Sequence, residues 1–171
     1  MEPWLRSDTI ALGALLVSLG SFWVSWRVHR RQVAASRPVF SAEAAPLSAR
    51  PGWWRLVIYL RNQTPYGIKC KALTVKQPWR ARILTSQQAY ELSANGKFQL
   101  RDHLPEQNAK RSVPMSLVAY EANQNAHREE LFVRWPGSPP SVLRLKISWH
   151  HLDEKQHLKN KALRTTLPAA N

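Results

Sequence analysis

The sequence has few of the residues that build disulfides, metal centres and nucleotide-binding loops. Its 171 residues include one cysteine, so neither an intrachain disulfide nor a cluster of thiolate zinc ligands can form. There are six glycines, and neither G-x-x-x-x-G-K-[ST] nor G-x-G-x-x-G is present. G-x-S-x-G and H-E-x-x-H are missing as well. We therefore predict a protein that is not an enzyme and uses no cofactor.

Acidic residues are also scarce. The chain has 11 Asp and Glu against 25 Lys and Arg, and the part from Gln32 onward carries a net charge of +12. A bulk charge of this kind informs the choice of partner rather than the fold. It favours an anionic membrane surface, a nucleic acid or an acidic protein.

The one long uncharged stretch covers residues 9–26, TIALGALLVSLGSFWVSW. As a helix it would be roughly 27 Å long at ~1.5 Å per residue, close to the ~30 Å of a hydrocarbon core. Trp23, Trp26 and Arg27 can lie at the membrane interface. We predict a transmembrane helix over 9–26, after a short tail of residues 1–8. A cleaved signal peptide is the alternative, but it would need a basic start and a small-residue cleavage site after the apolar run.

Basic residues are distributed unevenly around this stretch. Arg6 precedes it, whereas Arg27, Arg30 and Arg31 follow it. The positive-inside rule then predicts a single-pass cell-membrane protein, with its N-terminus outside and its C-terminal domain in the cytoplasm. The basic segment 27–37 could continue the helix for two turns. There each basic residue would gain about 1 kcal/mol from anionic headgroups.

Small side chains recur at intervals of three and four residues along the same stretch. On a helix they form one stripe, made of Ala11, Ala14, Ser18, Ser21 and Ser25. Such a stripe lets a second helix approach closely and form hydrogen bonds across the gap. It predicts self-association or docking to a partner helix. A chance arrangement is the alternative, because small residues are common in membrane helices.

Beyond Pro38 the apolar pattern changes to the alternation of β-strands. We expect strands over 39–44, 53–62, 68–76, 81–85, 115–120, 130–135, 142–150 and 157–166. A bulge is expected near Ala72, where the alternation changes phase. Asn95-Gly96 predicts a hairpin within residues 90–101, although 87–92 could instead form a short helix.

This number of short strands predicts a mainly β domain over residues 38–171. An antiparallel, immunoglobulin-like β-sandwich fits best, and a small β-barrel is the alternative. With the helix before it, the expected fold is a single transmembrane α-helix followed by this sandwich.

Only one group of potential metal ligands is dense in the sequence. It consists of His150, His151 and His157 with Asp153 and Glu154. Adjacent residues on a strand point to opposite faces, so His150 and His151 cannot easily share one ion. The pattern favours an exposed hairpin and no metal.

Two further sites have structural interpretations. Cys70 falls on the apolar side of its strand, so we expect a buried, unreactive thiol. Asn62-Gln63-Thr64 matches the glycosylation acceptor pattern, which a cytoplasmic domain would not use.

Basic residues alternate with the apolar ones along several of these strands. If the strands share a sheet, its outer face is a basic patch with Trp53 and Tyr59 interleaved. Together with the segment after the helix, the residues predicted to bind an anionic surface are Arg27, Arg30, Arg31, Arg55, Arg61, Lys69, Lys71, Arg80, Arg82, Arg144, Lys146, Lys159 and Lys161. A merely solvated outer face is the structural alternative.

These features predict a membrane-anchored interaction module. The basic face would contact anionic lipid headgroups or an acidic protein. The alternative is a membrane-tethered nucleic-acid-binding module. In that case phosphates would meet the basic residues, and bases would stack on Trp53 and Tyr59.

Overall fold

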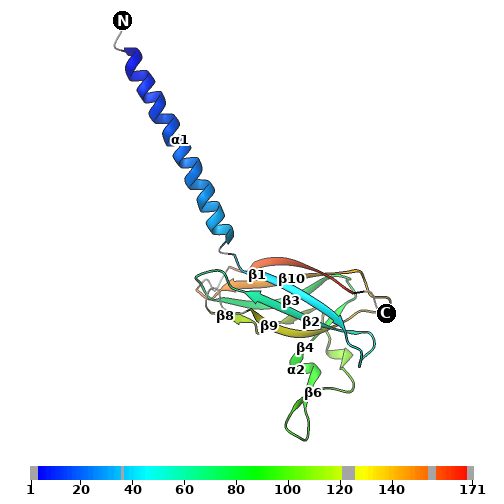
Figure 1. Ribbon diagram of the computed structural model, residues 1–171. Helices are drawn as coiled ribbons and strands as arrows, with labels where there is room; N and C mark the ends of the chain where they lie inside the picture. The colour runs from blue at the N-terminus through cyan, green and yellow to red at the C-terminus, as the bar shows by residue number, and fades with distance from the viewer. Residues whose placement is uncertain (1–3, 36, 121–125, 154–156, 169–171) are drawn as a thin grey trace. The chain divides into compact units, whose positions relative to one another are not determined.

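The chain divides into two units, an N-terminal helix within Met1–Arg37 and a β domain within Pro38–Asn171 (Figure 1). The computed structural model describes residues 4–35, 37–120, 126–153 and 157–168.

Helix α1 runs without interruption over Trp4–Ala35. The segment Ile10–Gln32 contains an 18-residue stretch with a mean hydropathy of 1.4, and the helix is long and apolar enough to span a membrane. The helix includes the basic turns after Trp26, as predicted. It also includes residues 4–8, which were predicted to lie in a tail. No proline lies inside the helix, and Pro38 follows its end, where the ring prevents a further helical turn.

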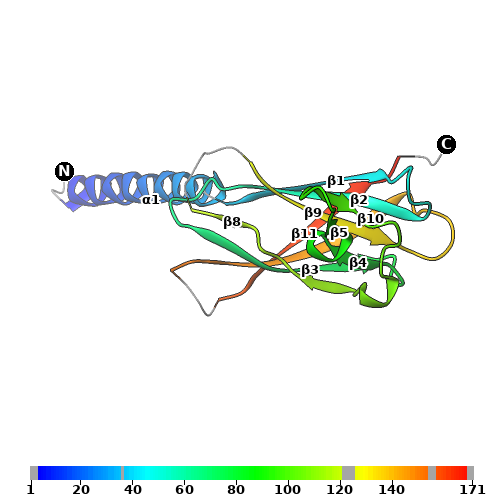
Figure 2. The same cartoon turned by 90° about the horizontal axis from the view of Figure 1, so that it is seen from below.

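The β domain consists of two antiparallel sheets and a small hairpin (Figure 2). The first sheet has the order β1-β2-β9-β4, and the second has β11-β10-β3-β7, with β8 also paired to β3. The strand bounds are β1 Val39–Pro46, β2 Trp53–Arg61, β3 Ile68–Gln77, β4 Arg82–Thr85, β5 Tyr90–Leu92, β6 Phe98–Leu100, β7 Ser112–Pro114, β8 Val118–Ala119, β9 His127–Arg134, β10 Val142–His151 and β11 Lys159–Thr166.

This strand order is that of an immunoglobulin-like sandwich. Strands β1, β2, β9 and β4 correspond to A, B, E and D of that fold, and β3, β10 and β11 correspond to C, F and G. The predicted β-sandwich is therefore confirmed. The inner rows of the two sheets form one apolar core. Among its members Leu56, Ile58 and Leu60 of β2 and Ile147 of β10 are fully buried.

The predicted irregularity in β3 is present. Ser148 of β10 pairs with Ala72, whereas the next residue, Trp149, pairs with Cys70, so Lys71 is left without a partner. The extra residue changes the phase of the alternation. Both Cys70 and Leu73 can therefore point into the core.

Residues 86–109, here called the excursion, leave the sandwich between β4 and β7. They contain the one-turn helix α2 Ser86–Ala89, the β5–β6 hairpin and the 3₁₀ turn η1 Glu106–Asn108. In Figure 1 the excursion projects away from the sheets beside β4, the edge strand of the first sheet. The hairpin predicted at Asn95-Gly96 is confirmed, and Gly96 has the positive φ of 73° that the turn requires.

Several strand bounds differ from the prediction. Residues 115–120 were expected to form one strand, but only Val118–Ala119 does so, and Ser112–Pro114 forms a strand where none was predicted. Strand β9 begins three residues before the predicted start, at His127. These segments carry too little apolar alternation to show a period of two.

Candidate functional site: a basic sheet face

The second sheet is the basic part of the domain. Its strands β3, β7, β8, β10 and β11 contain eight Lys and Arg residues and no Asp or Glu. Register then decides which side chains share a face, because directly paired residues point to the same side. Arg144 pairs with Arg164, and His150 pairs with Lys69, all on the side away from the core.

Five basic side chains therefore project from the outer surface of the second sheet. We call them the basic face: Lys69, Lys71, Arg144, Lys146 and Arg164. Lys146 is partly buried and the other four are exposed. Within the described ranges the structure gives none of the five a hydrogen bond or ion pair. The Arg144–Arg164 pair sets two like charges opposite each other, which costs about 0.2–1 kcal/mol.

Two lysines predicted on this face point the other way. Lys159 pairs with Trp149, and Lys161 pairs with Ile147, so both lie on the core side of β11. The Lys159 ammonium lies 5.5 Å from the centroid of the Trp149 ring, a cation–π contact. Arg164 was not among the predicted residues, although its alternation with Leu163 and Thr165 places it on the outer face.

The other predicted arginines of the β domain lie on or beside the first sheet, so the two sets do not form one patch. Arg55 forms an ion pair of 2.7 Å with Glu130, and this hydrogen bond raises the pKa of Arg55. Arg61 is exposed at the end of β2. Arg80 precedes β4, and Arg82 begins that strand. The outer face of the first sheet also carries acidic residues, so its charge is mixed.

The aromatic pair predicted to interleave with the basic residues is not on the basic face. Trp53 and Tyr59 are both on β2 of the first sheet. Trp53 is only 5% exposed because the excursion covers it, which contradicts its predicted accessibility. The hydroxyl of Tyr59 donates a hydrogen bond of 3.1 Å to Glu43.

An apolar cluster and one arginine hold the excursion against the first sheet. The cluster contains Trp53, Leu84 and Phe132 of the sheet together with Ala89 and Leu104 of the excursion.

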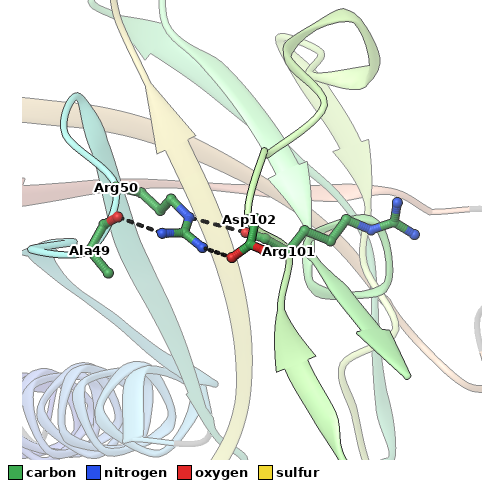
Figure 3. A network of polar contacts seen from close by, with 4 residues as sticks. All are labelled: Ala49, Arg50, Arg101 and Asp102. Carbon is green, nitrogen blue, oxygen red and sulfur yellow. Dashed lines mark hydrogen bonds and ion pairs between the residues drawn. The ribbon is translucent and has the colours of Figure 1, made fainter. Parts of the chain in front are cut away.

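Arg50, in the turn after β1, forms the polar part of this attachment (Figure 3). Its guanidinium donates hydrogen bonds to the carbonyl oxygens of Ala49 and Arg101, at 2.7 and 3.1 Å, and contacts the Asp102 carboxylate at 2.9 Å. The outer surface of the first sheet is therefore partly occupied by the chain itself.

On α1, Arg27 and Arg30 stack on aromatic rings one turn earlier. The Arg27 guanidinium lies 5.1 Å from the Trp23 ring centroid, and that of Arg30 lies 4.2 Å from the ring of Trp26. Arg31 is exposed. Residues of the small-residue stripe (Ala11, Ala14, Ser18, Ser21 and Ser25) are all exposed too, and helix association stays a prediction.

The thiol of Cys70 has the predicted environment. It is fully buried, and burial raises its pKa to about 12, with the nearby Glu129 carboxylate adding to the shift. Burial also raises the pKa of Glu129, which accepts the backbone N–H of Ser116 at 3.1 Å. A thiol that stays protonated at neutral pH is a poor nucleophile.

The predicted hairpin is present, because β10 and β11 form it and His157 is exposed there, but His150 and His151 at the end of β10 are not fully exposed. His150 is 6% exposed and points to the outer side with Lys69, while His151 points inward with Ile68. Among the described residues, no three His, Cys, Asp or Glu side chains are grouped to hold a metal ion. Glu154 lies outside the described residues.

The glycosylation pattern has a structural role. Asn62 and Thr64 are each 2% exposed, and the Asn62 side-chain oxygen accepts the backbone N–H of Thr64 at 2.9 Å. The Asn62 amide donates to the carbonyl of Tyr66 at 2.8 Å. The three residues therefore stabilise the turn between β2 and β3.

Comparison with known proteins gives a fold resemblance only. No known protein family matches the sequence, and no curated protein matches it. Similar solved structures include the N-terminal domain of PorA, with 10% identity over 79% of this chain and 100% of that domain and a TM-score of 0.38.

A PapD-like (ASH) domain of human CEP192 has 12% identity over 80% of this chain and 89% of that one, with a TM-score of 0.36. AvmM, which catalyses macrocyclization in alchivemycin A biosynthesis, has 10% identity over 77% and 91% and a TM-score of 0.36. One of the three is an enzyme. Similarities this remote carry no argument about the activity of this chain.

Proposed function

We propose that this protein is a non-enzymatic membrane-anchored module whose basic face binds the anionic headgroups of a lipid surface. Helix α1 anchors the chain, and the sandwich presents the basic face. The main observation that supports this proposal is the charge of the second sheet, which has eight basic residues and no acidic one. Like charges without internal counterions lower stability, and an external anionic surface would offset that cost.

The basic face suits lipid headgroups better than single-stranded nucleic acid. Stacking of bases needs exposed aromatic rings, and among the outward residues of β3, β10 and β11 the only ring is the buried His150. On the basic face, the residues between the charged ones are small or polar, such as Ala72, Ser148 and Ala162. Attraction of a flat basic surface to headgroups needs no pocket and contributes about 1 kcal/mol per basic residue.

Reversing two charges on the basic face should sharply weaken binding to anionic vesicles. We expect the domain comprising residues 38–171 to sediment with phosphatidylserine-containing vesicles at 0.05 M salt. The variant Arg144→Glu/Arg164→Glu should bind at least roughly 30-fold more weakly, since about 2 kcal/mol of attraction is lost. Raising the salt above about 0.3 M should release the unmodified domain because the charges are screened.

A charge-matched variant of the first sheet provides the control. Arg61→Glu/Arg128→Glu makes the same change in net charge at two exposed positions of the other sheet. It should retain binding within about threefold if the basic face is the contact, as the attraction decays over a Debye length. Equal losses in the two variants, or equal binding to neutral phosphatidylcholine vesicles, would contradict the proposal.

The orientation of the anchor is a second part of the proposal. The arginines after the apolar run favour a cytoplasmic β domain, where the inner leaflet offers anionic lipids. A cytoplasm-dependent reporter, such as a fluorescent protein that fails to mature after export, should be active when fused after Asn171. Activity only of an export-dependent reporter at the same position would reverse the orientation.

A further inference from the structure

A cavity of about 180 Å³ lies at one end of the sandwich. Val39, the first residue of β1, lies at the other end. The cavity is separate from the basic face, because its strands belong to the first sheet. Three arginines and one carboxylate line it together with two tryptophans, an alanine and a proline: Arg80, Arg82, Arg134, Glu106, Trp53, Trp135, Ala109 and Pro136. The charged groups of the lining add up to +2.

Strand pairing is what brings the arginines together. Arg82 of β4 is directly opposite Arg134 of β9, so two guanidinium groups extend from neighbouring strands. Like charges in direct cross-strand pairs repel. The repulsion is reduced because Glu106, from η1 of the excursion, forms an ion pair with Arg134. The lining thus contains one carboxylate and three arginines, and positive charge remains unbalanced.

Arg134 and Arg82 are positioned by contacts within the chain, and Arg82 keeps N–H donors for a ligand. Arg134 lies over the buried ring of Trp53, 6.0 Å from its centroid. One nitrogen of Arg82 donates to the carbonyl oxygens of Trp79 and Ala81, at 3.3 and 3.1 Å. A guanidinium has five N–H donors in a rigid fork, so further donors of Arg82 stay free to bind an oxyanion.

We infer that this cavity binds a carboxylate group of an acidic peptide segment. The carboxylate of Glu106 forms an ion pair with Arg134, as the carboxylate of such a ligand would. Glu106 is therefore an internal stand-in for the ligand. Arginine forks match carboxylates with paired hydrogen bonds. The cavity is smaller than the roughly 300–1,000 Å³ typical of cofactor and drug-sized ligands, which suits one or two side chains of a partner protein.

The inference does not depend on lipid binding by the basic face. It uses other residues, on the other sheet, and the full chain in a non-ionic detergent can test it without any lipid. The probe is a fluorescently labelled tetraglutamate peptide, with a labelled tetraglutamine peptide and inorganic phosphate as comparisons. Binding is followed by fluorescence anisotropy at low salt, or by competition in the case of phosphate.

Two double variants separate the cavity from general charge attraction. Arg80→Gln/Arg82→Gln and Arg144→Gln/Arg164→Gln each remove two positive charges from exposed side chains. We expect the first to weaken tetraglutamate binding at least about tenfold, the effect of losing hydrogen bonds to a charged group. The second should change it by less than about threefold. Equal weakening in both would overturn the inference.

The variant Glu106→Gln gives a result of opposite sign. Removing the internal carboxylate frees Arg134, so the affinity for tetraglutamate should rise several-fold, while a merely structural role of Glu106 predicts no gain. An affinity that is unchanged or lower in Glu106→Gln contradicts the stand-in role. Equal binding of tetraglutamine, or competition by phosphate that exceeds that of free tetraglutamate, overturns the assignment to a carboxylate.

Discussion

Replacing Phe132 with alanine is expected to lower the free energy of unfolding of the β domain by about 3–5 kcal/mol. Phe132 is fully buried although its side chain points away from the main core. Its ring forms a T-shaped contact with the ring of Tyr90 at a centroid distance of 5.8 Å and belongs to the cluster beneath the excursion. Truncation leaves a cavity between the first sheet and the excursion, which the rigid sheet cannot collapse to fill.

Urea denaturation of residues 38–171, followed by far-ultraviolet circular dichroism, measures this loss. Val57→Ala is the matched control, since Val57 is on the same outer face but is only partly buried and lies outside the cluster. It should cost about 1 kcal/mol or less. Hydrogen exchange should also speed up in residues 86–109 of the Phe132 variant. Similar losses in the two variants would mean that the excursion contributes little to stability.

Introducing two arginines into the apolar run should remove the protein from the membrane. The favourable residues of the run contribute roughly 2–5 kcal/mol to insertion, at about 0.3–0.6 kcal/mol each. Each arginine at the centre of a span costs about 2.5–3.5 kcal/mol. In Leu15→Arg/Leu16→Arg the balance therefore becomes unfavourable, and both positions are exposed on the helix surface, with no contact inside the chain to offset the cost.

Carbonate extraction of cell membranes distinguishes the variants. The unmodified chain should stay in the pellet at its full mass of 19.6 kDa, and the double variant should appear in the supernatant. Val28→Arg/His29→Arg adds two arginines within the basic segment and should remain in the pellet. A mature protein that lacks the first 26 residues would instead identify the run as a cleaved signal sequence.

Local patterns predicted most of the elements. The uncharged run predicted the helix, and alternation predicted β2, β3 and β10 almost to their ends. Asn95-Gly96 identified the hairpin. Strands were not predicted correctly where the alternating stretch was short or polar. Strand β7 has only three residues, and β9 begins with His127 and carries Glu129 on its inner side.

The candidate site was predicted less completely because it depends on which strands become neighbours. Lys69, Lys71, Arg144 and Lys146 were correctly assigned to one outer face. Lys159 and Lys161 were wrongly assigned to it, since the apolar residues of β11 that establish its inward side come after them in the sequence. No local pattern shows that Arg82 lies opposite Arg134, or that Glu106 of the excursion pairs with Arg134.

The sequence by itself determined the anchor-like helix, the excess of positive charge and the β class of the domain, because each depends on composition or on a period of a few residues. The tertiary structure decided how the charge is divided. It collected strands without acidic residues into one sheet and buried Trp53 and Phe132 under the excursion. It also placed three arginines and one carboxylate in the lining of one cavity. These outcomes depend on contacts between distant segments, and a periodic pattern within one strand carries no record of its neighbours.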